Sequence, residues 1–201
     1  MTTIRSGLDA AARIAIANRT EALFRSCGAL RDGHFLLKSG RHGDAYVEKF
    51  AVLSDPAATG GVILAFETGR QLGVRAIFAE EVRDPDGSPR REFRRGFRVE
   101  PGERVLLVDD ILTTGGSLLA MIPAIEALGG EIVGCHVLVD RSGDERSTIT
   151  SPASGRRYPL RALWRLSLPT WDPGAETCPR CAAGDPLHAP GSTGAAPTPV
   201  G

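Results

Sequence analysis

The sequence predicts an α/β protein with a parallel sheet flanked by helices. Apolar runs at residues 104–108 and 131–139 have the length and composition of buried strands. Between them, residues 118–128 show helical periodicity and end at a pair of glycines, Gly129 and Gly130. A strand, a helix and a strand at this spacing form a right-handed βαβ unit, in which the two strands lie parallel.

The composition indicates one globular domain and excludes several classes of partner. The chain has 201 residues, of which 42% are hydrophobic and 24% charged, and its formal net charge is zero. Zero net charge gives no bulk attraction to nucleic acid. No apolar run approaches the roughly 20 residues of a membrane span. The N-terminal stretch carries Asp9 and Glu21 and predicts an amphipathic helix rather than a signal peptide. We therefore expect a cytoplasmic protein with no nucleic-acid or membrane partner.

The remaining pattern predicts a single domain over residues 1–183. From Gly184 the chain is rich in Gly, Pro, Ala, Ser and Thr, which predicts a disordered tail over residues 184–201. The other expected elements are a helix over 8–27, a hairpin-like unit from 33 to 50, a helix over 62–72, a buried strand over 74–79, a long exposed loop from Glu80 to Arg95, and an edge strand over 160–168.

The most informative stretch follows the strand at 104–108. Asp109 and Asp110 stand at its carboxyl end, where open parallel sheets bind ligands, and Thr113 to Ser117 lead into the next helix. Free N–H groups at a helix start favour a phosphate, and the small residues of this turn let it approach closely. Neither GxxxxGK[ST] nor GxGxxG is present. A ligand that satisfies both the acids and the cradle must carry hydroxyls and a phosphate, as ribose 5-phosphate does.

This stretch, VLLVDDILTTGGS at residues 105–117, resembles the phosphoribosyl pyrophosphate signature of the type I phosphoribosyltransferases. The resemblance implies that family's fold, a parallel sheet flanked by helices with a small N-terminal hood. The hood would span about residues 1–50 and the core about residues 60–170. The residues that would bind phosphoribosyl pyrophosphate are Lys38, Asp109, Asp110, Ile111, Leu112, Thr113, Thr114, Gly115, Gly116 and Ser117.

Most of the chain is similar to orotate phosphoribosyltransferases, through GHFLLKSGRHGDAY at 33–46 and RRGFRVEPGERVLLVDD at 94–110. That family forms orotidine 5′-phosphate and pyrophosphate in pyrimidine biosynthesis, as a homodimer with Mg²⁺ held mainly by the substrate. The resemblance places Tyr46, Val47, Thr113 and Arg141 at orotate. Arginine binds a carboxylate bidentately, although the residue alone would equally suit a surface position at a strand end.

The reaction passes through an oxocarbenium-like transition state, so the protein's work is positioning and electrostatics. We expect Asp109, Asp110, Arg90 and Arg91 to act in catalysis, the two arginines from the loop at 80–95, which in the family is a lid. Relatives tend to show Ala-Glu-Arg at the start of this loop. Here the third residue is Glu81, whose charge would repel pyrophosphate.

A second departure lies before Gly61. In relatives a helix and a buried strand separate the Asp-Pro turn from the Gly-Gly of the next helix, whereas only three residues separate Pro56 from Gly60 here. Thr59, Gly60 and Gly61 then represent the far end of the pyrophosphate loop, without its strand. The omission predicts an exposed apolar neighbour and impaired or absent activity. The alternative is that residues 51–53 supply a substitute strand.

The cysteines and histidines give weaker signals. Four cysteines do not make a disulfide scaffold at this length, and Cys135 fits a core position. Cys178 and Cys181 form a CxxC with His188 nearby, for which we expect a reduced pair rather than zinc, and no bound metal at the protein's own ligands. We expect His42 to be a surface-loop residue. Two functions remain as alternatives: a purine or pyrimidine salvage phosphoribosyltransferase, and a non-catalytic phosphoribosyl pyrophosphate-binding regulator or decayed copy.

Overall fold

A computed structural model describes residues 9–37, 39–48, 61–85, 87, 89–144 and 146–190. Its helices are α1 (Ala10–Ser26), α3 (Gly61–Leu72), α4 (Gly116–Ala127) and the short α5 (Pro179–Ala182). Its strands are β1 (Leu30–Leu36), β2 (His42–Val47), β3 (Glu80–Arg83), β4 (Pro89–Glu92), β5 (Arg104–Leu112), β6 (Glu131–Asp140), β7 (Thr148–Thr150), β8 (Arg157–Arg165), β9 (Thr170–Trp171) and β10 (Leu187–His188).

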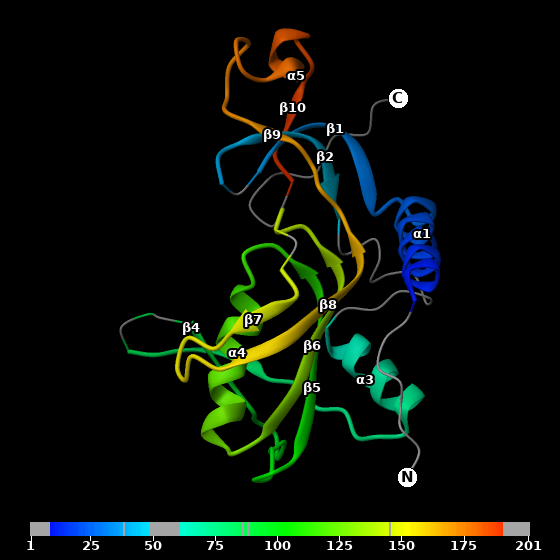
Figure 1. The fold of residues 1–201 in the computed structure, drawn as a ribbon. Coiled ribbons are helices and arrows are strands. Elements are labelled where there is room, and N and C mark those ends of the chain that lie inside the picture. The colour runs from blue at the N-terminus through cyan, green and yellow to red at the C-terminus, as the bar shows by residue number, and fades with distance from the viewer. Residues whose placement is uncertain are drawn as a thin grey trace.

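The core is a four-stranded sheet in the order β5-β6-β8-β7. Strands β5, β6 and β8 run parallel, as the βαβ pattern predicts, and β7 adds an antiparallel edge. The register sets Asp109 beside Val137, and Val137 beside Ala162. Figure 1 shows α4 on one side of this sheet and α1 and α3 on the other. The carboxyl ends of β5 and β6 therefore meet at the same edge of the sheet.

Apolar packing holds the helices against both sides. Leu118, Ile122 and Ile125 of α4 are buried against strand residues that include Leu107 and Cys135. On α1, Phe24 packs edge-on against Trp164 of β8, with ring centroids 5.7 Å apart. Cys135 is fully buried, which confirms its predicted core position, and burial raises the pKa of its thiol to about 12.

A second sheet, in the order β10-β1-β2-β9, forms the hood above the core sheet (Figure 1). Its centre is the predicted hairpin of β1 and β2, but its outer strands come from the far end of the chain. His34 of β1 pairs with Leu187, and His42 of β2 pairs with Trp171. The hood is therefore not confined to residues 1–50. The prediction of disorder from Gly184 is wrong for residues 184–190, because β10 is held by β1; residues 191–201 lie outside the described residues.

Three predicted elements differ in the structure. Residues 74–79 form no strand, and Val74 is 59% exposed, because no described strand pairs with β5 on the side away from β6. The predicted loop at 80–95 contains a hairpin of β3 and β4, in which Glu81 lies opposite Arg91 and the unlike charges favour pairing. The predicted edge strand at 160–168 is β8, which lies between β6 and β7. Among the described helices, none has the length and apolar character needed to cross a bilayer.

Candidate active site

The loop between β5 and α4 has the geometry of a phosphate cradle. The strand ends at Leu112 and the helix begins at Gly116. Gly115, between them, has φ +88°, a left-handed conformation that strains any residue with a side chain. No side chain caps the start of α4. Its first backbone N–H groups, which have no partner within the helix, are therefore available to an anion.

A hollow of about 160 Å³ lies over this loop. At roughly 30 Å³ per water, it has room for about five water molecules, enough for one phosphate group with its neighbouring atoms. Most of the residues predicted to bind the ribose phosphate line the hollow. The lining residues are Asp109, Ile111, Leu112, Thr113, Thr114, Gly115, Gly116 and Ser117.

The two acids of the motif lie differently. Successive side chains in a strand point to opposite faces, so Asp109 lines the hollow whereas Asp110 does not. Burial, and then the charge of Asp110, raise the pKa of Asp109 above its ordinary value. Asp110 accepts a hydrogen bond from the backbone N–H of Ile111, 2.7 Å away. The structure thus places one of the two predicted acids at the cradle.

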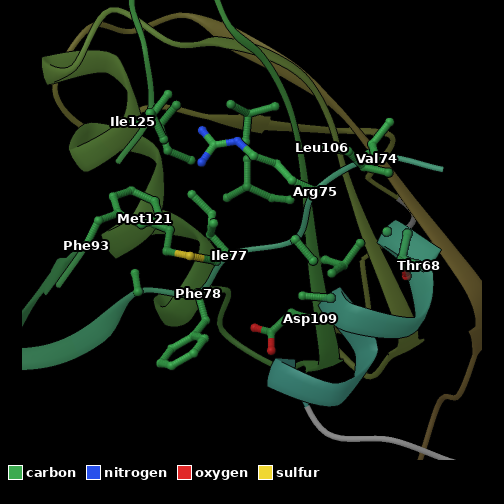
Figure 2. Close-up of a pocket in the computed structure, with 18 of the residues that line it drawn as sticks. Thr68, Val74, Arg75, Ile77, Phe78, Phe93, Leu106, Asp109, Met121 and Ile125 are labelled. Carbon is green, nitrogen blue, oxygen red and sulfur yellow. The ribbon is translucent and has the colours of Figure 1, made fainter. Parts of the chain in front are cut away.

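A larger cavity of about 710 Å³ lies on the open side of β5. Its walls are α3, the segment 74–79, β5 and α4, and most of its lining is apolar, including Ile77, Leu106 and Met121 (Figure 2). Asp109 and Ser117 belong to both cavities, so the two are continuous at the end of β5. The cavity occupies the position where a strand beside β5 would pair.

The predicted basic residues of the lid, Arg90 and Arg91, are neighbours on β4, so their side chains point to opposite faces of the β3–β4 hairpin. Arg91 lines the large cavity together with Asp109, and its charge acts to lower the pKa of that carboxyl. Its side chain is 26% exposed and lies 3.6 Å from Glu81. Arg90 is 49% exposed and bonds to Asp84 at 2.7 Å. Of the two, Arg91 is the one that faces the site.

Three of the four predicted orotate-binding residues, Tyr46, Thr113 and Arg141, come together from the hood and the core. Arg141 follows β6, and its backbone N–H donates to the carbonyl of Leu112 at 2.7 Å, which ties it to the cradle loop that contains Thr113. Its Nε is buried with no hydrogen-bond partner among the described residues, and burial lowers the pKa of its guanidinium. Tyr46 of β2 is close enough for its pKa to respond to the charge of Arg141. A buried guanidinium nitrogen to which no described residue is hydrogen-bonded is suited to a ligand carboxylate.

Val47 does not share this position. It is buried in the apolar cluster around Phe24, Ala29 and Trp164, on the opposite face of β2 from Tyr46. Its side chain therefore packs the hood onto the core, and the predicted lining role falls to Tyr46. Lys38, Thr59 and Gly60, together with the alternative strand at 51–53, lie outside the described residues, and Gly61 is the first residue of α3.

Sequence reasoning missed the surroundings of His34 and His42. Both are buried in the hood, 3% and 5% exposed, beside Cys178 and Cys181, so the prediction that His42 lies on the surface is wrong. His188, the predicted neighbour of the CxxC, lies instead against the ring of Phe35. The available signal was the pair of histidines eight residues apart on the two strands of a hairpin.

Comparison with known proteins agrees with this geometry. A family model described as a phosphoribosyl transferase domain matches residues 56–156. An orotate phosphoribosyltransferase of Caldicellulosiruptor saccharolyticus is 37% identical over 194 residues, covering 85% of this chain and 94% of the relative. One from Thermus thermophilus is 38% identical over 190 residues, covering 83% and 96%. The crystal structure of orotate phosphoribosyltransferase from Aeropyrum pernix has the same fold, with a TM-score of 0.56 at 23% identity, covering 73% of this chain and 93% of that one.

The same comparison supports the predicted omission. The match to the C. saccharolyticus protein extends over 194 positions, but 85% of 201 residues is only about 171 residues. More than 20 positions of the alignment therefore have no counterpart in this chain, about the length of an average helix plus strand. Among the described residues, no strand pairs with β5 on the side away from β6, and the cavity of about 710 Å³ lies there, which agrees with such a loss. With its cradle, its fold and these relatives taken together, the chain belongs to the orotate phosphoribosyltransferase family of type I phosphoribosyltransferases.

Proposed function

We propose that this protein transfers the 5-phosphoribosyl group from phosphoribosyl pyrophosphate to orotate, giving orotidine 5′-phosphate and pyrophosphate. The observation that carries the proposal is the environment of Arg141. Its buried Nε has no hydrogen-bond partner in the part of the chain that the structure describes, and its backbone is hydrogen-bonded to Leu112 in the phosphate cradle. A carboxylate bound there lies beside the ribose phosphate, which favours orotate over a base without a carboxylate.

Each group of the donor then has a counterpart. The 5-phosphate binds the N–H groups at the start of α4 and the hydroxyls of Thr114 and Ser117, in the hollow of about 160 Å³. Asp109 accepts hydrogen bonds from the ribose hydroxyls. Pyrophosphate extends along the open side of β5 toward Arg91, which lines that cavity.

The chemistry is a substitution at C1 of the ribose. The C1–O bond to pyrophosphate breaks and its electron pair leaves with the pyrophosphate. A ring nitrogen of orotate forms the new C1–N bond and releases its proton to solvent. Positive charge develops on the ribose in the transition state, and the carboxylate of Asp109 stabilises it electrostatically. Arg91 stabilises the leaving charge. Tyr46 and Arg141 hold orotate in line, so that positioning lowers the entropic cost.

Mg²⁺ is part of the proposal, because the donor carries a pyrophosphate. Asp109, a partly buried carboxylate facing both cavities, is a suitable oxygen ligand for an ion that otherwise keeps substrate oxygens and waters. Bound there, the ion would neutralise charge on the leaving pyrophosphate.

We also propose a cytoplasmic homodimer. Large apolar side chains are exposed on and just after α3, which supports burial of this face against a second copy; they are Val62, Ile63, Phe66, Leu72 and Val74. Sedimentation of the purified protein tests this part of the proposal, and a monomer at micromolar concentration would contradict it.

The decisive experiment follows the absorbance of orotate after mixing the protein with phosphoribosyl pyrophosphate and Mg²⁺. Loss of the orotate band, with orotidine 5′-phosphate as product, supports the proposal. Parallel reactions with uracil or adenine separate it from base salvage. Calorimetry with phosphoribosyl pyrophosphate separates the remaining cases: binding without turnover indicates a regulator, and neither binding nor turnover indicates a decayed copy.

A further inference from the structure

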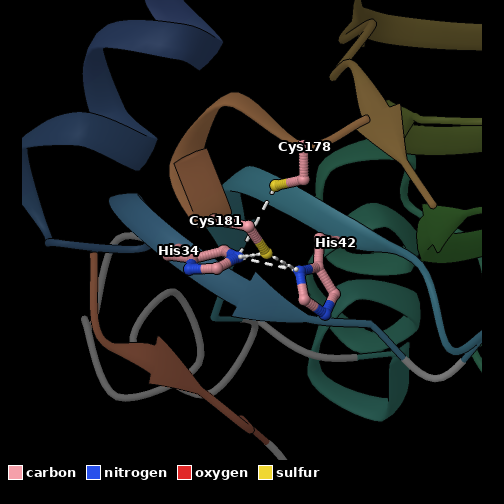
Figure 3. A group of neighbouring side chains, drawn as sticks. All are labelled: His34, His42, Cys178 and Cys181. Atoms are coloured by element: carbon pink, nitrogen blue, oxygen red, sulfur yellow. Dashed lines mark hydrogen bonds between the residues drawn. The ribbon is translucent and has the colours of Figure 1, made fainter. Parts of the chain in front are cut away.

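The hood contains a second cluster of chemically active side chains, away from the cradle. It consists of His34 on β1, His42 on β2, Cys178 just before α5 and Cys181 within α5 (Figure 3). Their ligand atoms all lie within 4.8 Å of one another. Three of the four residues are buried, and none of the four takes part in the proposed transfer reaction.

The distances within the cluster approach those of a tetrahedral zinc site. His34 Nε2 lies 2.8 Å from His42 Nδ1 and 3.6 Å from each of the two Sγ atoms, and His42 Nδ1 lies 3.2 Å from Cys181 Sγ. With Zn–N bonds of about 2.0–2.1 Å and Zn–S bonds of about 2.3 Å, the edges of a tetrahedron are roughly 3.3–3.8 Å. Changes of about half an ångström or less bring these four distances to those edges, and the other two, which are within 4.8 Å, need to shorten by about an ångström at most.

The surroundings of His34 fix which of its nitrogens faces the cluster as a ligand. His34 Nδ1 lies 2.9 Å from the backbone carbonyl of Asp185, which accepts only from a protonated nitrogen. Nε2 is then the unprotonated nitrogen, and its lone pair points at the other three ligand atoms. A histidine that donates through one nitrogen to a carbonyl while presenting the other to a centre is typical of metal ligands.

Charge and burial also favour a metal. Two thiolates balance the charge of Zn²⁺, so a Cys₂His₂ centre adds no net charge to a buried site. All four cysteines are unpaired in the structure, including Cys178 and Cys181. We therefore propose that His34, His42, Cys178 and Cys181 bind one structural Zn²⁺. Four protein ligands leave no open position for a substrate, so the ion acts on stability and not on the transfer chemistry.

The position of the site indicates what the ion stabilises. Outside the cluster, the C-terminal segment is attached to the hairpin by two short strands, β9 and β10, of two residues each. Arg41 adds hydrogen bonds to Thr170 and Asp172. A zinc ion would join both strands of the hairpin to α5, and Tyr46, on the same hairpin, would be held in place through β2.

The test measures zinc in the purified full-length protein by mass spectrometry. We expect one equivalent per chain in the wild type, and less than a tenth in Cys178→Ser and His34→Asn. Two matched controls should keep the zinc: Cys27→Ser, whose sulfur donates to the carbonyl of Phe24 at 3.6 Å, and His188→Asn, outside the cluster. Chelation should lower the melting temperature by at least about 5 °C, with recovery on adding zinc.

Cobalt gives a second readout that does not depend on the variants folding. Co²⁺ bound to the chelated wild type should show the visible bands of a tetrahedral ion and a thiolate charge-transfer band. A wild type that binds no stoichiometric zinc after reduction, a cobalt spectrum without thiolate absorption, or a Cys178–Cys181 disulfide in peptide maps of freshly purified protein would overturn the proposal.

Discussion

The two sides of β5 differ in completeness. On the side of the cradle, the strand leads directly into the loop and helix that bind phosphate, and β6 pairs with β5 along nearly its whole length. On the other side, the segment 74–79 passes β5 without pairing and leaves a cavity of about 710 Å³. The cradle is encoded within thirteen consecutive residues, whereas the other side depends on a neighbouring strand that the described residues do not supply. We therefore expect that loss of the strand beside β5 affects binding of the ribose phosphate less than binding and release of the pyrophosphate.

The largest effect is expected on the complete side, from Arg141→Ala. Loss of a bidentate, charged contact to orotate should reduce kcat/KM for orotate by about 100-fold or more, at about 1.5–3 kcal/mol per hydrogen bond to a charged group. Arg146→Ala is the matched control, because Arg146 lies at the same end of the sheet but pairs with Asp144. It should stay within about twofold of wild type. Equal losses in both variants would remove Arg141 from the orotate site.

The buried guanidinium of Arg141 should also lower the stability of the free protein. No described residue is hydrogen-bonded to its buried Nε, so Arg141→Met should raise the free energy of unfolding by about 1 kcal/mol while it abolishes the orotate contact. Urea denaturation measures this change. A less stable methionine variant would show that the guanidinium is satisfied in the free protein.

The next effect separates the two acids. Asp109→Asn should weaken binding of phosphoribosyl pyrophosphate by about 10- to 100-fold, because it removes a charged acceptor that faces both cavities. Asp110→Asn should change it much less, since Asp110 lines neither. Calorimetric titration of both variants checks the order. A larger loss for Asp110 would contradict the arrangement at the end of β5.

Asp109 also predicts a pH dependence. Burial and the charge of Asp110 raise its pKa above the ordinary 3.8, so the carboxylate takes up a proton at a higher pH than a free aspartate. Affinity for phosphoribosyl pyrophosphate should fall as pH decreases through this raised pKa, and Asp109→Asn should lack that step. The stability effect has the opposite sign: ionising Asp109 costs folding free energy as pH rises from 3.8 through the raised value, so the asparagine variant should be the more stable one at pH 7.

On the open side of β5, substitutions should have a smaller effect, and this effect should appear in kcat. Arg91→Ala should lower kcat by about tenfold, because Arg91 lines the cavity with Asp109. Arg90→Ala should leave kcat nearly unchanged, since Arg90 is bonded to Asp84 at the surface. Steady-state kinetics at saturating substrates compares the pair, and a reversed order would place Arg90 in the site instead.

The cradle side of β5 was also predicted more accurately from the sequence than its open side. The strand predicted at 104–108, which the structure extends to Leu112, the cradle and the helix predicted at 118–128 were predictable, because period, turn residues and helix start all lie within one short stretch. The apolar run at 74–79 has the composition of a strand, but a strand also needs a neighbour, and among the described residues it has none. The short step from Pro56 to Gly60 predicted an omission, but the composition of 74–79 does not register it. The pairing of β10 with β1, which sets Leu187 beside His34, likewise cannot be predicted from the local sequence of either strand. The His-Cys cluster was missed for that reason.

The smallest expected effect tests whether the open side of β5 is truly empty in solution. Ala65 of α3 lines the cavity of about 710 Å³, so Ala65→Leu should bury new methyl groups there and raise the free energy of unfolding by about 1 kcal/mol. Ala29→Leu is the matched change at a filled position, since Ala29 is fully buried against the cluster of Phe24 and Trp164, and it should cost about 1–3 kcal/mol through overpacking. Urea denaturation compares the two. If Ala65→Leu is as destabilising as Ala29→Leu, other parts of the chain or a second copy fill the space beside β5, and the loss of its neighbouring strand has been compensated.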